Sequence, residues 1–207
     1  KLDLAGPRRA GLATAANEWA GYVGVAIAAW ATGFLAATYG LRPVPFYLGL
    51  GLAVAGLLVS SLLIRPTRAF AEQEAEEGKP GVPTGGKGLS PGAMVIRTTW
   101  SDRTLLAASQ AGLCTNLKDG LIWGLLPIYL QGAGLSTGRI GIIAAVYPAV
   151  WGFGQLGTGP LSDRIGRKWL IAGGMAIQGM GLLLFLSGTT FPSWMAAAVV
   201  AGLGTAL

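Results

Sequence analysis

Two adjacent side chains of opposite charge, Lys118 and Asp119, lie inside an otherwise apolar stretch, residues 104–130. If this stretch is a helix that enters a membrane at residue 104, Lys118 lies about 21 Å deep, at about 1.5 Å per residue. A lone charge at that depth costs at least about 2.5–3.5 kcal/mol, so the pair needs a reason to be there. It could bind an ionic solute or pass a proton, or it could be a structural ion pair that locks two helices together.

Helical spacing divides the polar side chains of this stretch between two faces. Asn116, Asp119 and Trp123 fall on one stripe, and we expect that stripe to face a central cavity. Lys118 points about 100° away from the stripe and could reach around to a carboxylate on another helix.

A second polar and aromatic set repeats at helical spacing within residues 140–161. Tyr147, Trp151 and Gln155 follow one another at i, i+4 and i+8. This row is either a cavity wall or an interface between helices. The residues that we predict to line a substrate or proton cavity are Asn116, Lys118, Asp119, Trp123, Tyr147, Trp151 and Gln155.

The composition excludes several kinds of chemistry. The chain of 207 residues contains no His and a single Cys, Cys114. Catalysis by a Ser-His-Asp or Cys-His unit, a structural zinc site and an internal disulfide therefore lack the residues they need. We predict no catalytic residue, no metal site and no cofactor, and a protein that is not an enzyme.

Long uncharged runs divide the sequence. Hydrophobic residues make up 52% of the chain and charged residues 12%, which is about half the share usual in a soluble domain. About 20 apolar residues span a bilayer as a helix. We therefore predict an all-α polytopic membrane protein with six transmembrane helices at residues 19–39, 44–64, 104–130, 140–161, 169–187 and 192–207.

Lys and Arg are distributed unevenly between the predicted loops. Most of the 15 fall in residues 1–18, 65–103 and 162–168. The positive-inside rule makes these segments cytoplasmic. We expect a multi-pass protein of the cell (plasma or inner) membrane. The net charge of +6 is then a topology signal and not a nucleic-acid-binding surface. Residues 65–103 are rich in Gly and Pro in their middle, which is typical of a linker.

Residues 159–168, GPLSDRIGRK, place glycines, a carboxylate and several cations between two predicted spans. Glycine permits a tight reversal between antiparallel helices. Asp163 can pair with the cations or lie at the N-terminus of a neighbouring helix, where the dipole favours it. The simpler alternative is a positively charged membrane anchor with one ion pair.

This segment resembles the GxxxDRxGR[KR] loop signature of the major facilitator superfamily at every defined position. The matching residues are Gly159, Asp163, Arg164, Gly166, Arg167 and Lys168. The resemblance implies that the loop is a conformational latch and not a substrate site. By the pseudosymmetry of that family, Asp163 would face the start of the first predicted span, around Asn17 and Glu18.

The resemblance also implies an architecture, because the family carries a second, weaker copy of the signature between its eighth and ninth helices. Residues 1–64 would then be the last two helices of the N-terminal half, 65–103 the central linker, and 104–207 the first four helices of the C-terminal half, the last one truncated. We expect an internal fragment of a secondary active transporter that carries a small solute across the lipid bilayer by alternating access. A proton is a candidate coupling ion. The alternative is a non-transporting sensor or scaffold, and the substrate and oligomeric state are not predicted.

Overall fold

Helices joined by short turns make up the described part of the protein, which confirms the predicted fold class. A computed structural model describes residues 10–63 and 90–207, and no strand occurs within those ranges. Residues 65–89 of the predicted linker, and residues 1–9 of the predicted cytoplasmic N-terminal segment, lie outside the described residues. The helical elements are α2 (Ala10–Tyr39), α3 (Val44–Leu63), α5 (Pro91–Ile96), the π-helical turn η2 (Arg97–Ser101), α6 (Arg103–Gly132), α7 (Thr137–Ile165), α8 (Arg167–Ser187) and α9 (Phe191–Ala206).

Each predicted span corresponds to one long helix. By length and hydropathy, α2, α3, α7 and α8 can cross a membrane, and α9 is a shorter apolar helix of 16 residues. Helix α6 is 30 residues long but carries Lys118 and Asp119 near its middle. The two adjacent charged residues that the sequence singled out therefore lie halfway along the most polar of the long helices.

Two helices extend beyond the apolar runs that predicted them. Helix α2 begins at Ala10, nine residues before the predicted start at residue 19. The added residues are rich in Ala, the best helix former, so the helix continues where hydropathy falls. Helix α7 likewise runs through Pro160 to Ile165.

A single residue joins α7 to α8. Gly166 has φ of 81°, in the left-handed region that favours glycine, and its N–H donates to the carbonyl of Ser162. The reversal at the GPLSDRIGRK segment therefore depends on one glycine between two helices.

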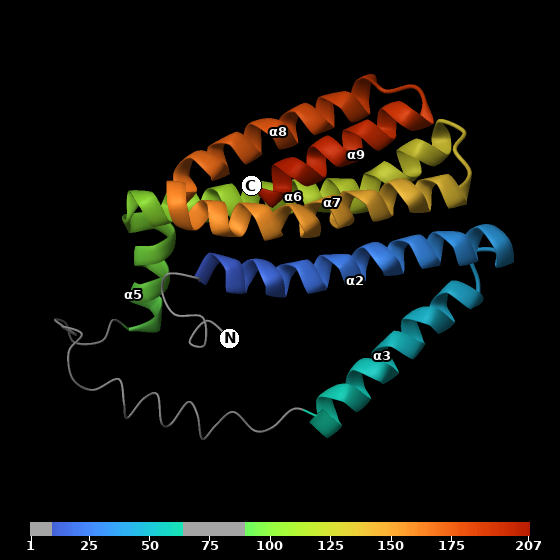
Figure 1. The fold of residues 1–207 in the computed structure, drawn as a ribbon, viewed down its shortest axis with the longest axis horizontal. Helices are drawn as coiled ribbons and strands as arrows, with labels where there is room; N and C mark the ends of the chain where they lie inside the picture. The colour runs from blue at the N-terminus through green and yellow to red at the C-terminus, as the bar shows by residue number, and fades with distance from the viewer. Residues whose placement is uncertain (1–9, 64–89) are drawn as a thin grey trace. The chain divides into compact units, whose positions relative to one another are not determined.

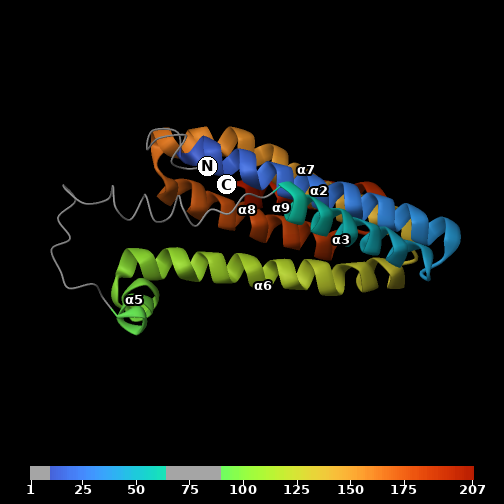
Figure 2. The ribbon, with the colours of Figure 1, turned by 90° about the horizontal axis from the view of Figure 1, so that it is seen from below.

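The chain divides into two compact units, Lys1–Pro45 with Ala111–Leu207, and Phe46–Gln110. In the second unit, Asp102 caps α6, because its Oδ1 accepts the N–H groups of Thr104 and Leu105 at 2.9 and 3.0 Å. In the first unit, α7 packs against α2 and against α9, and α8 packs against α9. Figure 1 and Figure 2 both show α2 and α7 side by side.

Small residues allow α8 and α9 to approach closely. Ala197, Ala198 and Ala201 of α9 are fully buried. A methyl group added to Gly181 of α8 would lie 2.8 Å from the Cα of Ala201. Gln178 of α8 donates from Nε2 to the carbonyl of Gly204 at 3.2 Å. Packing of small residues with an interhelical hydrogen bond is how helices associate in a membrane.

Candidate functional site

Lys118 and Asp119 belong to a polar cluster that joins three helices of the first unit. Lys118 Nζ lies 2.8 Å from Asp119 Oδ1 and donates to Tyr147 Oη at 2.5 Å and to Thr205 Oγ1 at 2.8 Å. Tyr147 Oη donates to Asp119 Oδ1 at 2.5 Å. Helix α6 therefore contributes the ion pair, α7 the phenol and α9 the hydroxyl. We call these four residues the Lys118 cluster.

The cluster is buried on one side and open on the other. Lys118 is 8% exposed and Tyr147 2%, whereas the side chain of Asp119 keeps 13% of its exposure. Lys118 Nζ also lies 4.9 Å from the centre of the Tyr147 ring, in cation–π range. The ammonium is thus enclosed by its partners, and the carboxylate forms the accessible edge.

The other predicted residues of α6 lie beside the Lys118 cluster but do not hydrogen-bond to it. Asn116 Nδ2 donates to the carbonyl of Gly112 on its own helix at 2.9 Å, and its side chain is exposed. The ring of Trp123 meets that of Tyr147 edge-on, with centroids 5.9 Å apart. Asn116, Asp119 and Trp123 thus share one accessible stripe, as the helical spacing requires.

The predicted row on α7 runs from the Lys118 cluster towards α2. Trp151 stacks on Tyr22 of α2 with centroids 3.5 Å apart, and its ring centre lies 6.0 Å from that of Tyr147. Trp151 Nε1 and Gln155 Oε1 are buried, and neither has a hydrogen-bond partner within the described ranges. The row therefore contributes Tyr147 to the Lys118 cluster and Trp151 to a helix interface, and its role as a cavity wall stays a prediction.

Sequence reasoning missed two contributors, Thr205 and Tyr22. Thr205 is one hydroxyl in an Ala- and Gly-rich helix, and it also donates to the carbonyl of Ala201 at 2.8 Å. Tyr22 lies within electrostatic reach of both Glu18 and Asp119. A single polar side chain in an apolar span gives no signal about its partner, because that partner is on another helix.

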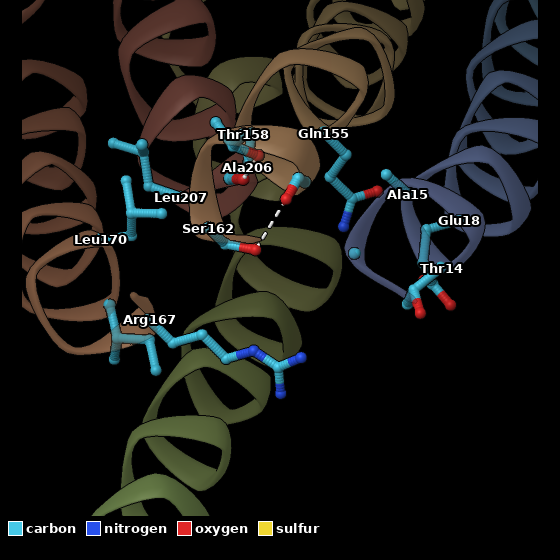
Figure 3. A pocket seen from close by; sticks show the side chains of 13 residues that line it. Thr14, Ala15, Glu18, Gln155, Thr158, Ser162, Arg167, Leu170, Ala206 and Leu207 are labelled. Carbon is cyan, nitrogen blue, oxygen red and sulfur yellow. Dashed lines mark hydrogen bonds between the residues drawn. The ribbon is translucent and has the colours of Figure 1, made fainter. Parts of the chain in front are cut away.

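Gln155 also lines a pocket of about 280 Å³, where α2 begins and α7 ends (Figure 3). Glu18 and Thr14 of α2 line it together with Ser162 of α7 and Arg167 of α8. Ser162 Oγ donates to the carbonyl of Gly159 at 2.7 Å. The structure therefore places Glu18, one of the predicted latch partners, on the wall of this pocket.

Asp163 meets the first turn of α2. The N–H of Gly11 donates to Asp163 Oδ1 at 3.3 Å. A methyl group added to Gly159 would lie 2.6 Å from the Cβ of Ala15 and 2.8 Å from the carbonyl oxygen of Gly11. A carboxylate at a helix N-terminus is favoured by the free N–H groups and by the helix dipole.

The cations of the signature are exposed. Arg164, Arg167 and Lys168 keep much of their surface open, and Lys168 Nζ lies 5.1 Å from the ring centre of Trp169. Asn17 and Glu18 lie about two turns beyond Gly11 on α2. The signature thus meets α2 through its carboxylate, at the first turn of that helix.

We expect a disulfide between cysteines introduced at Gly11 and Asp163 in a Cys114→Ser background, because these positions already touch. A cysteine at Asn17 paired with one at Asp163 should crosslink far less, since Asn17 lies about 9 Å further along the helix and on another side. Gel mobility after mild oxidation measures both pairs. Equal crosslinking of the two pairs would contradict the register of α2 against α7.

No group of three or more His, Cys, Asp or Glu that could hold a metal ion occurs in residues 10–63 and 90–207.

Comparison with known proteins identifies the family. The family model described as Major Facilitator Superfamily matches residues 2–207. The chain belongs to the major facilitator superfamily. The GPLSDRIGRK segment between α7 and α8, which resembles the loop signature of this superfamily, lies within the matched residues, and the apolar helices are those of a membrane protein.

Curated members of the superfamily match parts of the chain. The inner membrane transport protein YajR of Escherichia coli (strain K12) is 35% identical over 96 residues, which are 46% of this chain and 20% of that protein. The inner membrane transport protein YnfM of the same strain is 34% identical over 92 residues, 44% of this chain and 21% of that protein. The major facilitator-type transporter ecdD of Aspergillus rugulosus is 29% identical over 109 residues, 46% of this chain and 20% of that protein.

These matches cover about a fifth of the length of each relative. No solved structure matches the chain. The family membership therefore rests on the family model across the chain, and the activity of the whole protein is a matter for proposal.

Proposed function

We propose that the protein containing this chain carries a small solute across a membrane by secondary active, alternating-access transport. The observation that carries the proposal is the Lys118 cluster, which places a charged, hydrogen-bonded group inside a bundle of apolar helices. Ionisable residues inside membrane helices usually mark a substrate or ion pathway. The names of the curated relatives, two of which are inner membrane transport proteins, support the same function and a multi-pass membrane location.

The depth of the Lys118 cluster fits a transport site. Lys118 is 15 residues from the start of α6, or about 22 Å along a helix of 30 residues. Transporters bind substrate near the middle of the membrane, between repeats. Asn116, Lys118, Asp119, Trp123 and Tyr147 would form the solute and proton site, with Trp151 and Gln155 extending its wall towards α2.

The contacts between α2 and α7 suit a rocking motion. The helices touch through Gly11 and Gly159 near one end and through Gly33 and Gly141 near the other. We propose that they belong to opposite six-helix halves, as helices five and eight of twelve, with residues 65–103 as the linker. The 159–168 loop would then act as a latch, with Asp163 holding the first turn of α2.

The orientation follows from the same contact. Gly11 and Asp163 are hydrogen-bonded, so the start of α2 and the α7–α8 turn lie at one end of the unit. The positively charged segments that include these residues would both be cytoplasmic, as the positive-inside rule requires. Residues 65–103 would share that side.

A proton is the coupling ion that the Lys118 cluster suits. Tyr147 Oη donates to Asp119 and accepts from Lys118, so a chain of hydrogen bonds joins the base to the acid. A solute that disturbs the ion pair would change where its proton resides.

Transport is tested with the full-length protein in vesicles that contain a trapped pH-sensitive dye. A sugar, an amino acid, a carboxylate and an amine are added in turn to one side. We expect one class to move protons and to accumulate when a pH gradient is imposed. Cys114→Ser serves as the control, because Cys114 is exposed and outside the Lys118 cluster. Failure of every class in vesicles that hold folded protein would overturn the proposal in favour of a sensor or scaffold.

A further inference from the structure

Lys118 has no free hydrogen-bond donor. An ammonium group has three N–H bonds. Its nitrogen already contacts Asp119 Oδ1, Tyr147 Oη and Thr205 Oγ1 at 2.5–2.8 Å. An anionic solute could reach this buried nitrogen only by displacing one of those partners.

Asp119 has an open oxygen. Both of its hydrogen-bonding contacts, from Lys118 and Tyr147, go to Oδ1. In residues 10–63 and 90–207 no donor to Oδ2 is found, and the side chain keeps 13% of its exposure. An ionised carboxylate can accept about four hydrogen bonds, so Oδ2 can accept an N–H group from a bound molecule.

The accessible surface beside Asp119 is aromatic. Trp123, four residues further along the same stripe, is 40% exposed, and its ring contacts that of Tyr147. The stacked rings of Tyr22 and Trp151 continue this aromatic surface, since the centre of the Trp151 ring lies 6.0 Å from that of Tyr147. A carboxylate flanked by aromatic rings favours a cation, because the ring faces are negative.

We infer that the solute is an organic cation that binds Asp119 Oδ2 through a protonated amine attached to an aromatic or apolar body. This inference rests on the proposed transport function and names its substrate class. The amine N–H donates to Oδ2, and the Trp123 ring contacts the body. Lys118 does not touch the solute.

The same geometry couples the solute to a proton. A bound ammonium and the Lys118 ammonium would face one carboxylate, and like charges at such a distance disfavour each other. Lys118 therefore releases one proton to water as one monovalent cation binds, and its nitrogen becomes a neutral amine. The titratable groups around that nitrogen are Asp119 on α6 and Tyr147 on α7, with Tyr22 of α2 near Asp119, while α9 contributes the neutral Thr205.

The test compares three probes with one indole body and different charge: tryptamine (cationic), tryptophol (neutral) and indole-3-acetate (anionic). Calorimetry on the full-length protein in detergent measures each affinity, and buffers of different ionisation enthalpy measure proton release. We expect tryptamine to bind most tightly with release of a proton. Asp119→Asn should lower the affinity for tryptamine by about 10- to 100-fold, which is the effect of losing one hydrogen bond to a charged group.

Lys118→Met should change the affinity for tryptamine in the opposite direction to Asp119→Asn, which a purely structural role of the pair would not produce. It leaves Asp119 without its competitor, so tryptamine should bind several-fold more tightly and release no proton. If Asp119→Asn folds poorly, the double variant Lys118→Met/Asp119→Asn, which has no unpaired charge, should show the same weak binding. Cys114→Ser should bind as the wild type does.

Two results would overturn the inference: tighter binding of indole-3-acetate with loss on Lys118→Met, or no preference of the folded wild-type protein for tryptamine. Flux is measured separately in vesicles. If tryptamine binds and both variants change its affinity in the expected directions, but no amine is transported, the proposed transport is overturned and the cation site is supported. Flux with a preference for anions would support the proposed transport and overturn the cation site.

Discussion

Replacing Asp119 with Asn is expected to abolish transport and to destabilise the protein, because the Lys118 ammonium would lose the one charged partner that it has within residues 10–63 and 90–207 while remaining buried. Removing one member of a buried ion pair costs about 3–5 kcal/mol. Thermal unfolding in detergent measures the stability of the variant, and proteoliposome flux measures its activity.

The double variant Lys118→Met/Asp119→Asn separates the two roles that the sequence left open. Replacing both members of a buried pair by groups of similar volume is often neutral for stability. We expect unfolding within about 1 kcal/mol of the wild type, since the amide oxygen of the introduced asparagine could still accept from Tyr147, and no flux. Transport by the double variant at the wild-type rate would show that the pair is only a structural lock.

Lys118→Met alone should destabilise the protein less than Asp119→Asn does. Asp119 is the more exposed member of the pair and would keep its hydrogen bond from Tyr147. Cys114→Ser on the same helix controls for the handling of α6 variants, because that thiol is exposed. A double-mutant cycle over the four proteins then gives the coupling between the two charges.

The sequence predicted the elements of the fold well, because uncharged runs of about 20 residues have one solution in a membrane. It predicted the helix ends less well. Hydropathy marks where a helix is apolar, whereas Ala10–Glu18 is helical through its Ala content. The predicted partners of Asp163, Asn17 and Glu18, were chosen from the start of the apolar run. Asp163 meets Gly11, because the free N–H groups that attract a carboxylate belong to the first turn of the helix itself.

The Lys118 cluster could be predicted in part. Charge in an apolar stretch identified Lys118 and Asp119, and helical spacing identified Tyr147. The pairing could not be predicted, because Lys118 was expected to seek a carboxylate on another helix. In the structure it pairs with its neighbour Asp119 and reaches α7 and α9 through the hydroxyls of Tyr147 and Thr205. A long, flexible side chain has many possible partners, and packing decides among them.

Gly141→Leu and Gly159→Leu are each expected to arrest the proposed transport cycle, because each variant forces α2 and α7 apart at a different end of their contact. A Cβ added to Gly141 would lie 2.7 Å from the Cα of Gly33, and one added to Gly33 would lie 2.6 Å from the Cα of Gly141. A Cβ added to Gly159 would meet the Cβ of Ala15 at 2.6 Å. These contacts are with backbone or short side chains, so the helices must separate to admit a larger residue.

The cost of overpacking the helix contact sets the size of the expected loss of flux. Overpacking costs typically 1–3 kcal/mol, which shifts a two-state equilibrium by about 5- to 150-fold. We expect flux to fall by about tenfold or more in Gly141→Leu and Gly159→Leu. Gly157→Leu on α7 and Gly24→Leu on α2 are the matched controls, because a Cβ at either position meets no atom of the described residues within 4 Å. They should transport at close to the wild-type rate.

The direction of arrest is measured with a cysteine at Asn116 in the Cys114→Ser background, labelled by a membrane-impermeant thiol reagent. If Asn116 faces the solute cavity, Gly141→Leu should speed labelling from the outside and Gly159→Leu should speed it from the cytoplasmic side, in inverted vesicles. The opposite pattern would reverse the proposed orientation, since the two contacts would then have exchanged sides. Unchanged labelling with full flux in both variants would mean that α2 and α7 do not separate during transport, and alternating access would then need a different pair of helices.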